Sequence, residues 1–152
     1  MNDDEIRDSI DASLRDRVFE KVKEIYGAQY TAFNGIRIVS ITKDETRLSM
    51  SLDNKLNSLL FAHGGAVYTI ADNAFAFAAN IGDDLQIALS GSIIYHRPGT
   101  GKELTAVTSM VSDTNSVSTY NVKVYCDGKH IATATFTGFK IKDRTRQFRS
   151  PS

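Results

Sequence analysis

One stretch limits what this chain can fold into: LNSLLFAHGGAVYTIADNAFAFAAN, from Leu56 to Asn80. Nearly every residue between Ala66 and Ile81 is apolar or small, which predicts a helix that is apolar on all sides. Such a helix is buried inside a protein and does not lie on its surface. Its many alanines allow other backbone segments to approach closely. We therefore expect a sheet that curls around one long central helix.

Segments that alternate apolar and polar residues lie on both sides of this helix and predict an antiparallel sheet of about five to six strands. Turn signals such as Pro98-Gly99 and Asp127-Gly128 separate them. Four of these strands follow the helix in series and are expected to form a meander. One apolar helix among serial antiparallel strands predicts an α+β fold. The expected strands are 36–42, 46–52, 85–97, 103–112, 116–125 and 130–142.

An additional helix is expected ahead of the sheet. Apolar residues from Ile6 to Ile25 recur at helical spacing, and Gly27 is a plausible stop. With no linker or repeat, the chain is expected to be a single domain over 1–152. Within it, residues 1–28 form the N-terminal helix and the basic residues 143–152 form a flexible tail.

Charge and composition exclude several classes of partner. The 18 basic and 18 acidic side chains balance, so nothing in the charge favours nucleic acid or an anionic membrane as a partner. The acidic start is unlike a signal peptide, no segment is long enough to span a bilayer, and the single Cys126 suits a reducing compartment. We therefore expect a cytoplasmic protein.

Asp72 is the one residue that does not fit a plain buried helix. An unpaired carboxylate is costly to remove from water, so a buried one is hydrogen-bonded or has a raised pKa. General bases and carboxylate nucleophiles exploit both conditions. The alternative is that Asp72 lies at an edge of the helix or caps a nearby backbone group.

Gly64 and Gly65 stand where this helix should begin. The first N–H groups of a helix have no internal partner, and a site without side chains lets a substrate carbonyl approach them. The positive end of the helix dipole would then stabilise an oxyanion. The alternatives are a glycine turn that only redirects the chain and, for the preceding His63, a structural histidine.

The spacing between these groups sets a further condition. Gly64 and Asp72 are eight residues apart, which is about 12 Å along a helix. A reacting carbonyl must lie within about 3 Å of its donors and close to its base. Either one of the two residues is not catalytic, or each site joins Gly64 of one subunit to Asp72 of another. A two-fold homodimer would build two such sites.

These residues together resemble a known family. Asn57, His63-Gly64-Gly65 and Ala71-Asp72 followed by NAFAFAAN are similar to the hotdog-fold acyl-CoA thioesterases, in the phenylacetate-degradation (PaaI-like) branch of the 4-hydroxybenzoyl-CoA thioesterase superfamily. The strand order and YHRPG extend the resemblance over most of the chain. It implies a hotdog fold, a homodimer that often pairs into a dimer of dimers, and hydrolysis of a small or medium acyl-CoA, aromatic ones included. It implies neither a metal nor a cofactor, CoA being part of the substrate.

The resemblance also implies roles for individual residues. Asp72 matches the catalytic carboxylate, which acts as general base on water or as nucleophile. Gly64 matches the residue whose backbone N–H polarises the thioester carbonyl, and Gly65 supports that turn. Asn57 and His63 match positions that orient the substrate or the turn.

The remaining assignments are less direct. Some relatives hold the attacking water with a serine or threonine near the start of the strand after the helix. Ala88 stands at that position here, and Ser90 two residues on is the candidate to replace it. Arg97 is the candidate for the CoA phosphates, because phosphates need cationic partners. Further basic candidates for the CoA phosphates are Lys102, Lys140, Lys142 and Arg144. The aromatic residues that contact the acyl group, or are simply part of the core, are expected to include Phe61, Tyr68, Phe75 and Phe77.

Three other functions stay open at this point. A non-catalytic acyl-CoA-binding or sensing module would keep the pocket and use Asp72 structurally. A hotdog enoyl-CoA hydratase or dehydratase would act on similar thioesters, although AHGGAVYTIAD differs from the histidine motifs of those relatives. A structural or protein-interaction domain would leave the embedded aspartate as a coincidence.

Overall fold

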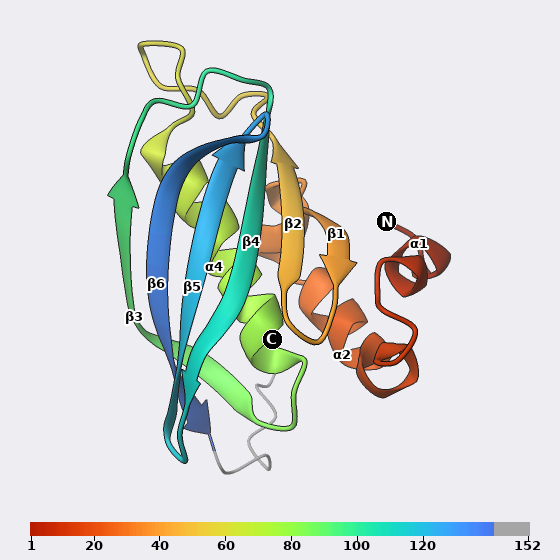
Figure 1. The fold of residues 1–152 in the computed structure, drawn as a ribbon. Helices are drawn as coiled ribbons and strands as arrows, with labels where there is room; N and C mark the ends of the chain where they lie inside the picture. The colour runs from red at the N-terminus through yellow and green to blue at the C-terminus, as the bar shows by residue number, and fades with distance from the viewer. Residues whose placement is uncertain (142–152) are drawn as a thin grey trace, which may run out of the picture.

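A six-stranded antiparallel sheet curves around one long helix, α4 (Figure 1). The computed structural model describes residues 1–141. The architecture is therefore the α+β arrangement predicted above, with the strand count at the upper end of the expected range. In chain order the elements are α1 (Asp3–Asp8), α2 (Arg15–Tyr26), α3 (Gln29–Phe33), β1 (Arg37–Ile41), β2 (Thr46–Ser51), α4 (Gly64–Asn80), β3 (Leu85–Tyr95), β4 (Glu103–Asp113), β5 (Val117–Cys126) and β6 (Lys129–Ile141).

Helix α4 begins and ends at side chains that bond to backbone. His63 is its N-cap, and Nδ1 of the ring accepts a hydrogen bond of 2.9 Å from the N–H of Gly65. At the other end the Asn80 side chain accepts a bond from the N–H of Gln86 at 2.7 Å and donates to the Gln86 carbonyl at 3.1 Å. This pair fixes the chain reversal from α4 into β3.

Burial around α4 is uneven, which corrects the expectation of a helix buried on all sides. The sheet-facing residues, such as Ile70, Ala74 and Phe77, are completely buried. A stripe on the other side of the helix is less covered, because the sheet wraps only part of the circumference. Its members recur three or four residues apart and so share one face; they are Gly65, Thr69, Asp72, Ala76 and Asn80.

The strand order of the sheet is β1-β2-β4-β5-β6-β3. Strands β4, β5 and β6 form the predicted meander. The expectation that β3 pairs with β4 is wrong, since β3 crosses over and pairs antiparallel with β6. This crossover carries the chain past the helix, and it leaves β3 as an edge strand 11 residues long.

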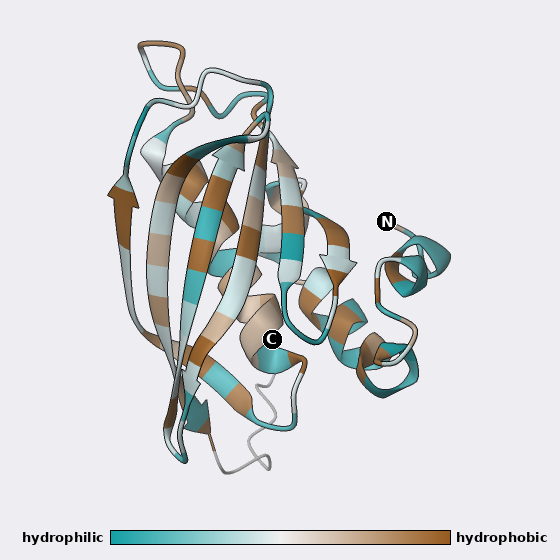
Figure 2. Cartoon of the chain, in the orientation of Figure 1, coloured by the Kyte–Doolittle hydropathy of each residue, from teal (hydrophilic) through white to brown (hydrophobic). Residues whose placement is uncertain are grey.

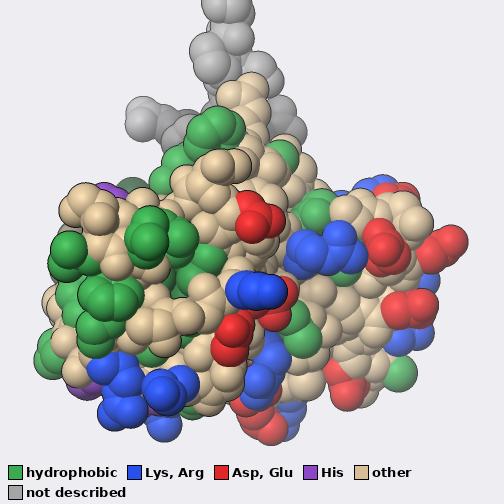
Figure 3. All heavy atoms as spheres, turned by 90° about the horizontal axis from the view of Figure 1, so that it is seen from above, with side chains coloured by type: hydrophobic (Ala, Val, Ile, Leu, Met, Phe, Trp, Pro, Cys, Tyr) green, Lys and Arg blue, Asp and Glu red, His purple; other side chains and the backbone are tan. Residues whose placement is uncertain are grey.

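Several large apolar side chains of β3 are exposed: Ile87 at 49%, Leu89 at 63% and Ile94 at 66%. Figure 2 shows hydrophobic residues on the arrowhead end of this edge strand, where a soluble protein usually places charge. Viewed from above, hydrophobic side chains gather on one side of the molecule, which β3 and the loop before α4 share (Figure 3). The β3 edge is therefore an apolar, unpaired surface within residues 1–141.

The N-terminal region differs from the single helix expected over residues 1–28. It forms α1 and α2, with a break between them, and a short α3 follows Gly27. The break arises because Ile10 forms a parallel bridge to Ile41, where the N–H of Ile41 donates to the Ser9 carbonyl at 2.8 Å. Gly27 ends α2, as predicted.

Two further predictions concern the ends of the chain and the membrane. The tail predicted for 143–152 lies outside the described residues. Among residues 1–141, no helix combines the length and apolar character needed to cross a membrane.

Candidate active site

A cavity of about 410 Å³ lies at the N-terminal end of α4. The loop before the helix and the chain that leaves β3 form its walls. It brings together three of the residues selected from the sequence, Asn57, Gly64 and Arg97. The other lining residues are Phe61, Ala62, Val67, Tyr95, His96, Pro98, Gly99 and Ile131.

Asn57 shapes the loop that leads into α4. Its side-chain oxygen accepts hydrogen bonds from the N–H groups of Leu59 at 2.9 Å and Phe61 at 3.1 Å, and its own N–H donates to the Phe61 carbonyl at 2.8 Å. These bonds hold a tight loop in which Leu60 has a positive φ of 61°. The structure thus gives Asn57 a turn-holding position at the wall of the cavity.

The double glycine does not serve a left-handed turn. Neither Gly64 nor Gly65 has positive φ, and both belong to the first turn of α4. Helical glycine is less stable than alanine by up to about 1 kcal/mol, so backbone freedom gives no reason for the pair. An added β-carbon on Gly64 would lie 3.4 Å from the Tyr95 hydroxyl oxygen and 3.5 Å from its ring, which is ordinary contact. What Gly64 provides is an open approach to its own backbone.

The N–H of Gly64 is available to a ligand. The carbonyl of Gly64 accepts a hydrogen bond of 3.0 Å from the Tyr95 hydroxyl, but the Gly64 N–H has no protein partner among residues 1–141. Burial, aided by the nearby Tyr68, raises the pKa of Tyr95, so its hydroxyl stays a neutral donor. The neighbouring N–H of Gly65 is already bonded to His63. The Gly64 N–H therefore stands at the positive end of a 17-residue helix, on a residue that lines the cavity.

Asp72 lies on the partly exposed stripe of α4 and is itself half-buried. At about 100° per residue, its side chain points between those of Tyr68 and Thr69 on the preceding turn. The carboxylate makes no hydrogen bond or ion pair with the part of the chain that the structure describes. Desolvation by burial raises its pKa above that of an ordinary aspartate. This state suits a carboxylate that accepts a proton or attacks a carbonyl.

Gly64 and Asp72 do not meet within one chain. Both belong to the same unbroken helix, so about 12 Å of helix separates them, and Asp72 is not among the residues that line the cavity. Within one chain, the N–H donor of Gly64 therefore has no carboxylate near it, and the Asp72 carboxylate has no such donor near it.

Ser90 is not brought to either place. The next residue, Gly91, packs on Tyr68 and Phe136 so tightly that a β-carbon there would collide with both, which puts Gly91 on the helix-facing side. Alternation along a strand places Ser90 on the opposite side, where it is exposed. A register shift between Ala88 and Ser90 leaves Ala88 on the side that faces α4.

The basic candidates separate into different regions. Arg97 is exposed at the cavity, while Lys102 is joined to Asp127 only through its backbone N–H. Lys140 is largely buried near the C-terminal end of α4, away from the cavity at Gly64, and pairs with Asp113 at 2.6 Å and Asp84 at 3.1 Å. Lys142 and Arg144 lie beyond the described residues.

The aromatic candidates also separate. Phe75 and Phe77 are buried core residues, whereas Phe61 lines the cavity and Tyr68 packs on Phe136 at a ring distance of 5.5 Å. The sequence reasoning missed Tyr95 as a neighbour of Gly64. Its place in YHRPG, at the end of a strand and before a turn, was the only available signal.

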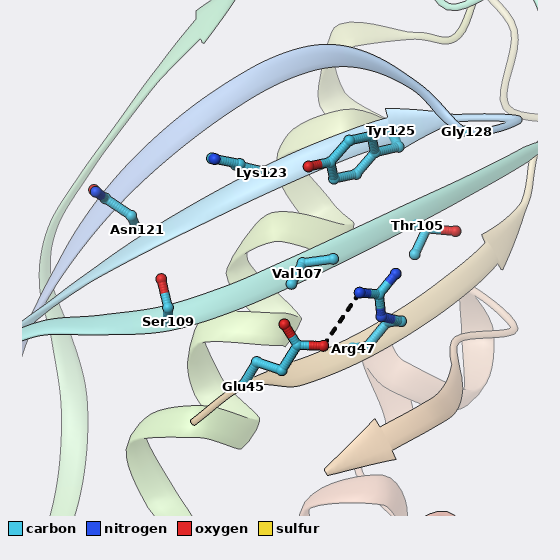
Figure 4. A pocket seen from close by; sticks show the side chains of 9 residues that line it. All are labelled: Glu45, Arg47, Thr105, Val107, Ser109, Asn121, Lys123, Tyr125 and Gly128. Carbon is cyan, nitrogen blue, oxygen red and sulfur yellow. Dashed lines mark hydrogen bonds and ion pairs between the residues drawn. The ribbon is translucent and has the colours of Figure 1, made fainter. Parts of the chain in front are cut away.

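A second hollow, of about 670 Å³, lies on the outer face of the sheet, away from α4 (Figure 4). Its lining is polar, and the Glu45–Arg47 ion pair of 3.1 Å offsets two of its charges. Lys123 and Tyr125 on β5 complete one wall. Neither Gly64 nor Asp72 borders it. Among residues 1–141 there is also no cluster of three or more side chains suited to hold a metal ion.

Comparison with known proteins identifies the family. Residues 61–133 match the family model of the thioesterase superfamily. A putative esterase of Archaeoglobus fulgidus is 30% identical over 110 residues, which cover 70% of this chain and 71% of that protein. The chain belongs to the thioesterase superfamily. Both Gly64 and Asp72 lie inside the matched region.

Other thioesterase-superfamily relatives include PaaI proteins. The acyl-coenzyme A thioesterase PaaI of Escherichia coli is 29% identical over 92 residues, or 59% of this chain and 66% of PaaI, just under two thirds of its length. A mutant of the phenylacetic acid degradation protein PaaI from Thermus thermophilus has a TM-score of 0.70 at 30% identity, over 75% of this chain and 100% of that chain. A hypothetical thioesterase of Streptococcus pneumoniae, solved with coenzyme A, has a TM-score of 0.68 at 23% identity, over 78% and 95% of the two chains.

These findings confirm the resemblance, the hotdog fold and the enzyme class predicted from the sequence. The thioesterase is a thioester hydrolase by family. Its acyl group, its catalytic residues and its assembly are matters for the proposal below.

Proposed function

We propose that this thioesterase hydrolyses a small or medium acyl-CoA, aromatic ones included, to the free acid and CoA. The observation that carries the proposal is Asp72: a carboxylate in the middle of an apolar helix, half-buried, with a raised pKa and no partner among residues 1–141. The cost of holding it there is explained if the carboxylate takes part in the reaction.

The reaction uses Asp72 and the N–H of Gly64. As general base, Asp72 removes a proton from water while the water oxygen bonds to the thioester carbonyl carbon. The N–H of Gly64 donates to the carbonyl oxygen as it gains negative charge. The C–S bond then breaks, and the thiolate of CoA takes up the proton held by Asp72. In the alternative route Asp72 attacks the carbonyl carbon itself, and the C–S bond breaks so that CoA leaves as a thiolate. Water then hydrolyses the mixed anhydride, which releases the acid, restores the Asp72 carboxylate and supplies the proton that CoA takes up.

Each site needs two subunits, because about 12 Å of helix separates the two groups in one chain. The β3 edge provides the contact in this proposal. It is long, apolar and unpaired, and an isologous pairing of two such edges across a two-fold axis would extend the sheet through both subunits. The same contact would cover the stripe of α4 that carries Asp72. The dimer of dimers stays a prediction from the family resemblance.

The cavity around Gly64 is the proposed entry for CoA. Arg97 is exposed there and suits a phosphate oxygen. Support for CoA as the carrier comes from the names of the relatives, one an acyl-coenzyme A thioesterase and another solved with coenzyme A.

A thiol-release assay over short, medium, long and aromatic acyl-CoAs tests the proposal. We expect turnover on at least one thioester, and no thiol release without enzyme. Running the assay beside sedimentation equilibrium shows whether the active species is a dimer.

Two outcomes would contradict the proposal. Tight acyl-CoA binding without turnover on any thioester would indicate a binding module. Hydration of an enoyl-CoA without thiol release would indicate a hydratase.

A further inference from the structure

The short helix α3 brings an aromatic side chain to the face of α4 that carries Asp72. The Tyr30 hydroxyl lies 3.0 Å from Oγ1 of Thr69, the residue one turn before Asp72 on the same face of α4. Next to it, the Thr31 hydroxyl donates to the Asn73 side chain at 2.9 Å, and this bond is buried. Two bonds therefore anchor α3 on the residues that flank the candidate carboxylate.

The surroundings of Asp72 are asymmetric. On the β3 side, the Tyr68 ring fills the space, since it packs on Phe136 and its hydroxyl touches Gly91. On the α3 side, Tyr30 is 57% exposed and the next stripe residue, Ala76, is small and only partly buried, so this side of the helix is less covered. In Figure 1, α4 lies between β3 on one side and the N-terminal helices on the other.

We propose that Tyr30 is a specificity-determining residue that forms the outer wall of the acyl channel and limits the length of the acyl group. This inference rests on the proposed thioesterase site. In this proposal, an acyl chain whose carbonyl lies at Asp72 extends toward the less covered α3 side. There it meets the Tyr30 ring, which its bond to Thr69 holds across the channel.

The wall is a feature of this chain's N-terminal part and not of the matched family region. Helix α3 spans Gln29–Phe33, whereas the family model begins at residue 61. The substrate range of this thioesterase is therefore expected to depend on a segment outside that region.

The test compares Tyr30→Ala with wild type on straight-chain butanoyl-, hexanoyl-, octanoyl- and decanoyl-CoA. Removing the ring opens the channel, so we expect the ratio of kcat/KM for decanoyl-CoA to that for butanoyl-CoA to rise at least about tenfold, since each newly buried methylene favours binding about fourfold. Tyr30→Phe keeps the ring and should stay within about threefold of wild type. Tyr125→Ala, which removes a tyrosine from the outer face of the sheet, is the matched control (Figure 4).

Binding is measured in parallel with S-butyl-CoA and S-decyl-CoA, thioethers that cannot be hydrolysed. In Tyr30→Ala, the affinity for the decyl analogue relative to that for the butyl analogue should rise by a similar factor. This measurement separates the two proposals. If the wild type hydrolyses no thioester but Tyr30→Ala still shifts the binding preference toward the decyl analogue, the proposed hydrolysis is wrong and the proposed role of Tyr30 stands.

Three results would contradict the proposal that Tyr30 limits the length of the acyl group. One is a folded Tyr30→Ala variant with unchanged chain-length profiles in both measurements. Another is an equal shift in Tyr125→Ala. The third is loss of the dimer in Tyr30→Ala by sedimentation, which would make Tyr30 a subunit contact.

Discussion

The N-terminal end of α4 and its middle are built in opposite ways. At the end, Gly64 lines a formed cavity, the preceding loop is held by Asn57, and the helix is capped by His63. In the middle, Asp72 has no hydrogen-bond partner among residues 1–141 and lies on the side of the helix that the sheet leaves partly uncovered. The contacts around Gly64 are therefore complete within a single chain, whereas those around Asp72 are not.

Under the proposed function, this difference indicates where each half of the reaction centre would be assembled. A donor site can be built from loop and helix-cap bonds of one subunit. A desolvated carboxylate without a partner is stable only if the rest of the fold offsets its cost. We infer that the partner subunit supplies the complement of Asp72 and covers the exposed stripe.

Replacing the carboxylate should give the largest effect. Asp72→Ala and Asp72→Asn are expected to lower kcat at least about a thousandfold, because the base or nucleophile is lost. The thiol-release assay measures this, with Asp83→Asn as control, an acid that is almost fully exposed just beyond α4. Activity of Asp72→Ala within tenfold of wild type would remove Asp72 from the reaction.

Removing the donor at the other end should cost about a hundredfold to a thousandfold in kcat. Gly64→Pro deletes the N–H at the first helical position, where proline is tolerated. His63 before it has φ −63° and ψ 134°, the extended form that proline requires of its predecessor. Gly64→Ala keeps the N–H and should lose less than about tenfold. Equal losses in both variants would show that space, not the N–H, matters at this position.

A charge on the β3 edge should weaken the link between the two regions. Leu89→Lys is expected to shift the protein toward monomer in sedimentation and to lower activity at least about tenfold. Val39→Lys is the matched control, since Val39 is 48% exposed on β1, the other edge strand. A fully active Leu89→Lys monomer would contradict the shared site.

The smallest expected effect is on stability. The raised pKa of Asp72 means that the folded state binds its proton more tightly than the unfolded state, so the carboxylate lowers stability above its unfolded pKa of about 3.9. Asp72→Asn should therefore have a higher Tm than wild type at neutral pH. The difference should shrink as pH falls through the raised pKa toward the unfolded value. Thermal melts from pH 3 to 8 measure it, and a lower Tm for Asp72→Asn at neutral pH would indicate a structural role.

Much of this fold followed from local patterns in the sequence. The apolar run gave α4, alternation gave the strands, and the eight-residue spacing already separated Gly64 from Asp72. The pairing of β3 with β6 did not follow, because strand order depends on contacts between residues far apart in sequence. The break after α1 was missed for the same reason, since it depends on the bridge between Ile10 and Ile41.

The candidate site was predicted less completely than the fold. A register shift near Ala88 reverses the alternation of side chains, so spacing alone placed Ser90 on the wrong side for the helix. The uncovered stripe of α4 depends on how far the sheet wraps around the helix, and the approach of Tyr30 to Thr69 depends on how α3 packs on α4. No local sequence pattern predicts these packing arrangements.

Mixing two inactive variants tests the shared site most directly. In a heterodimer of Asp72→Asn and Gly64→Pro, one of the two sites has both an intact Gly64 N–H and an intact Asp72. Random mixing should therefore restore about a quarter of wild-type activity, since half of the dimers are mixed and each holds one intact site. If mass spectrometry shows heterodimers and the thiol-release assay shows no recovery, the donor and the carboxylate do not come from different subunits.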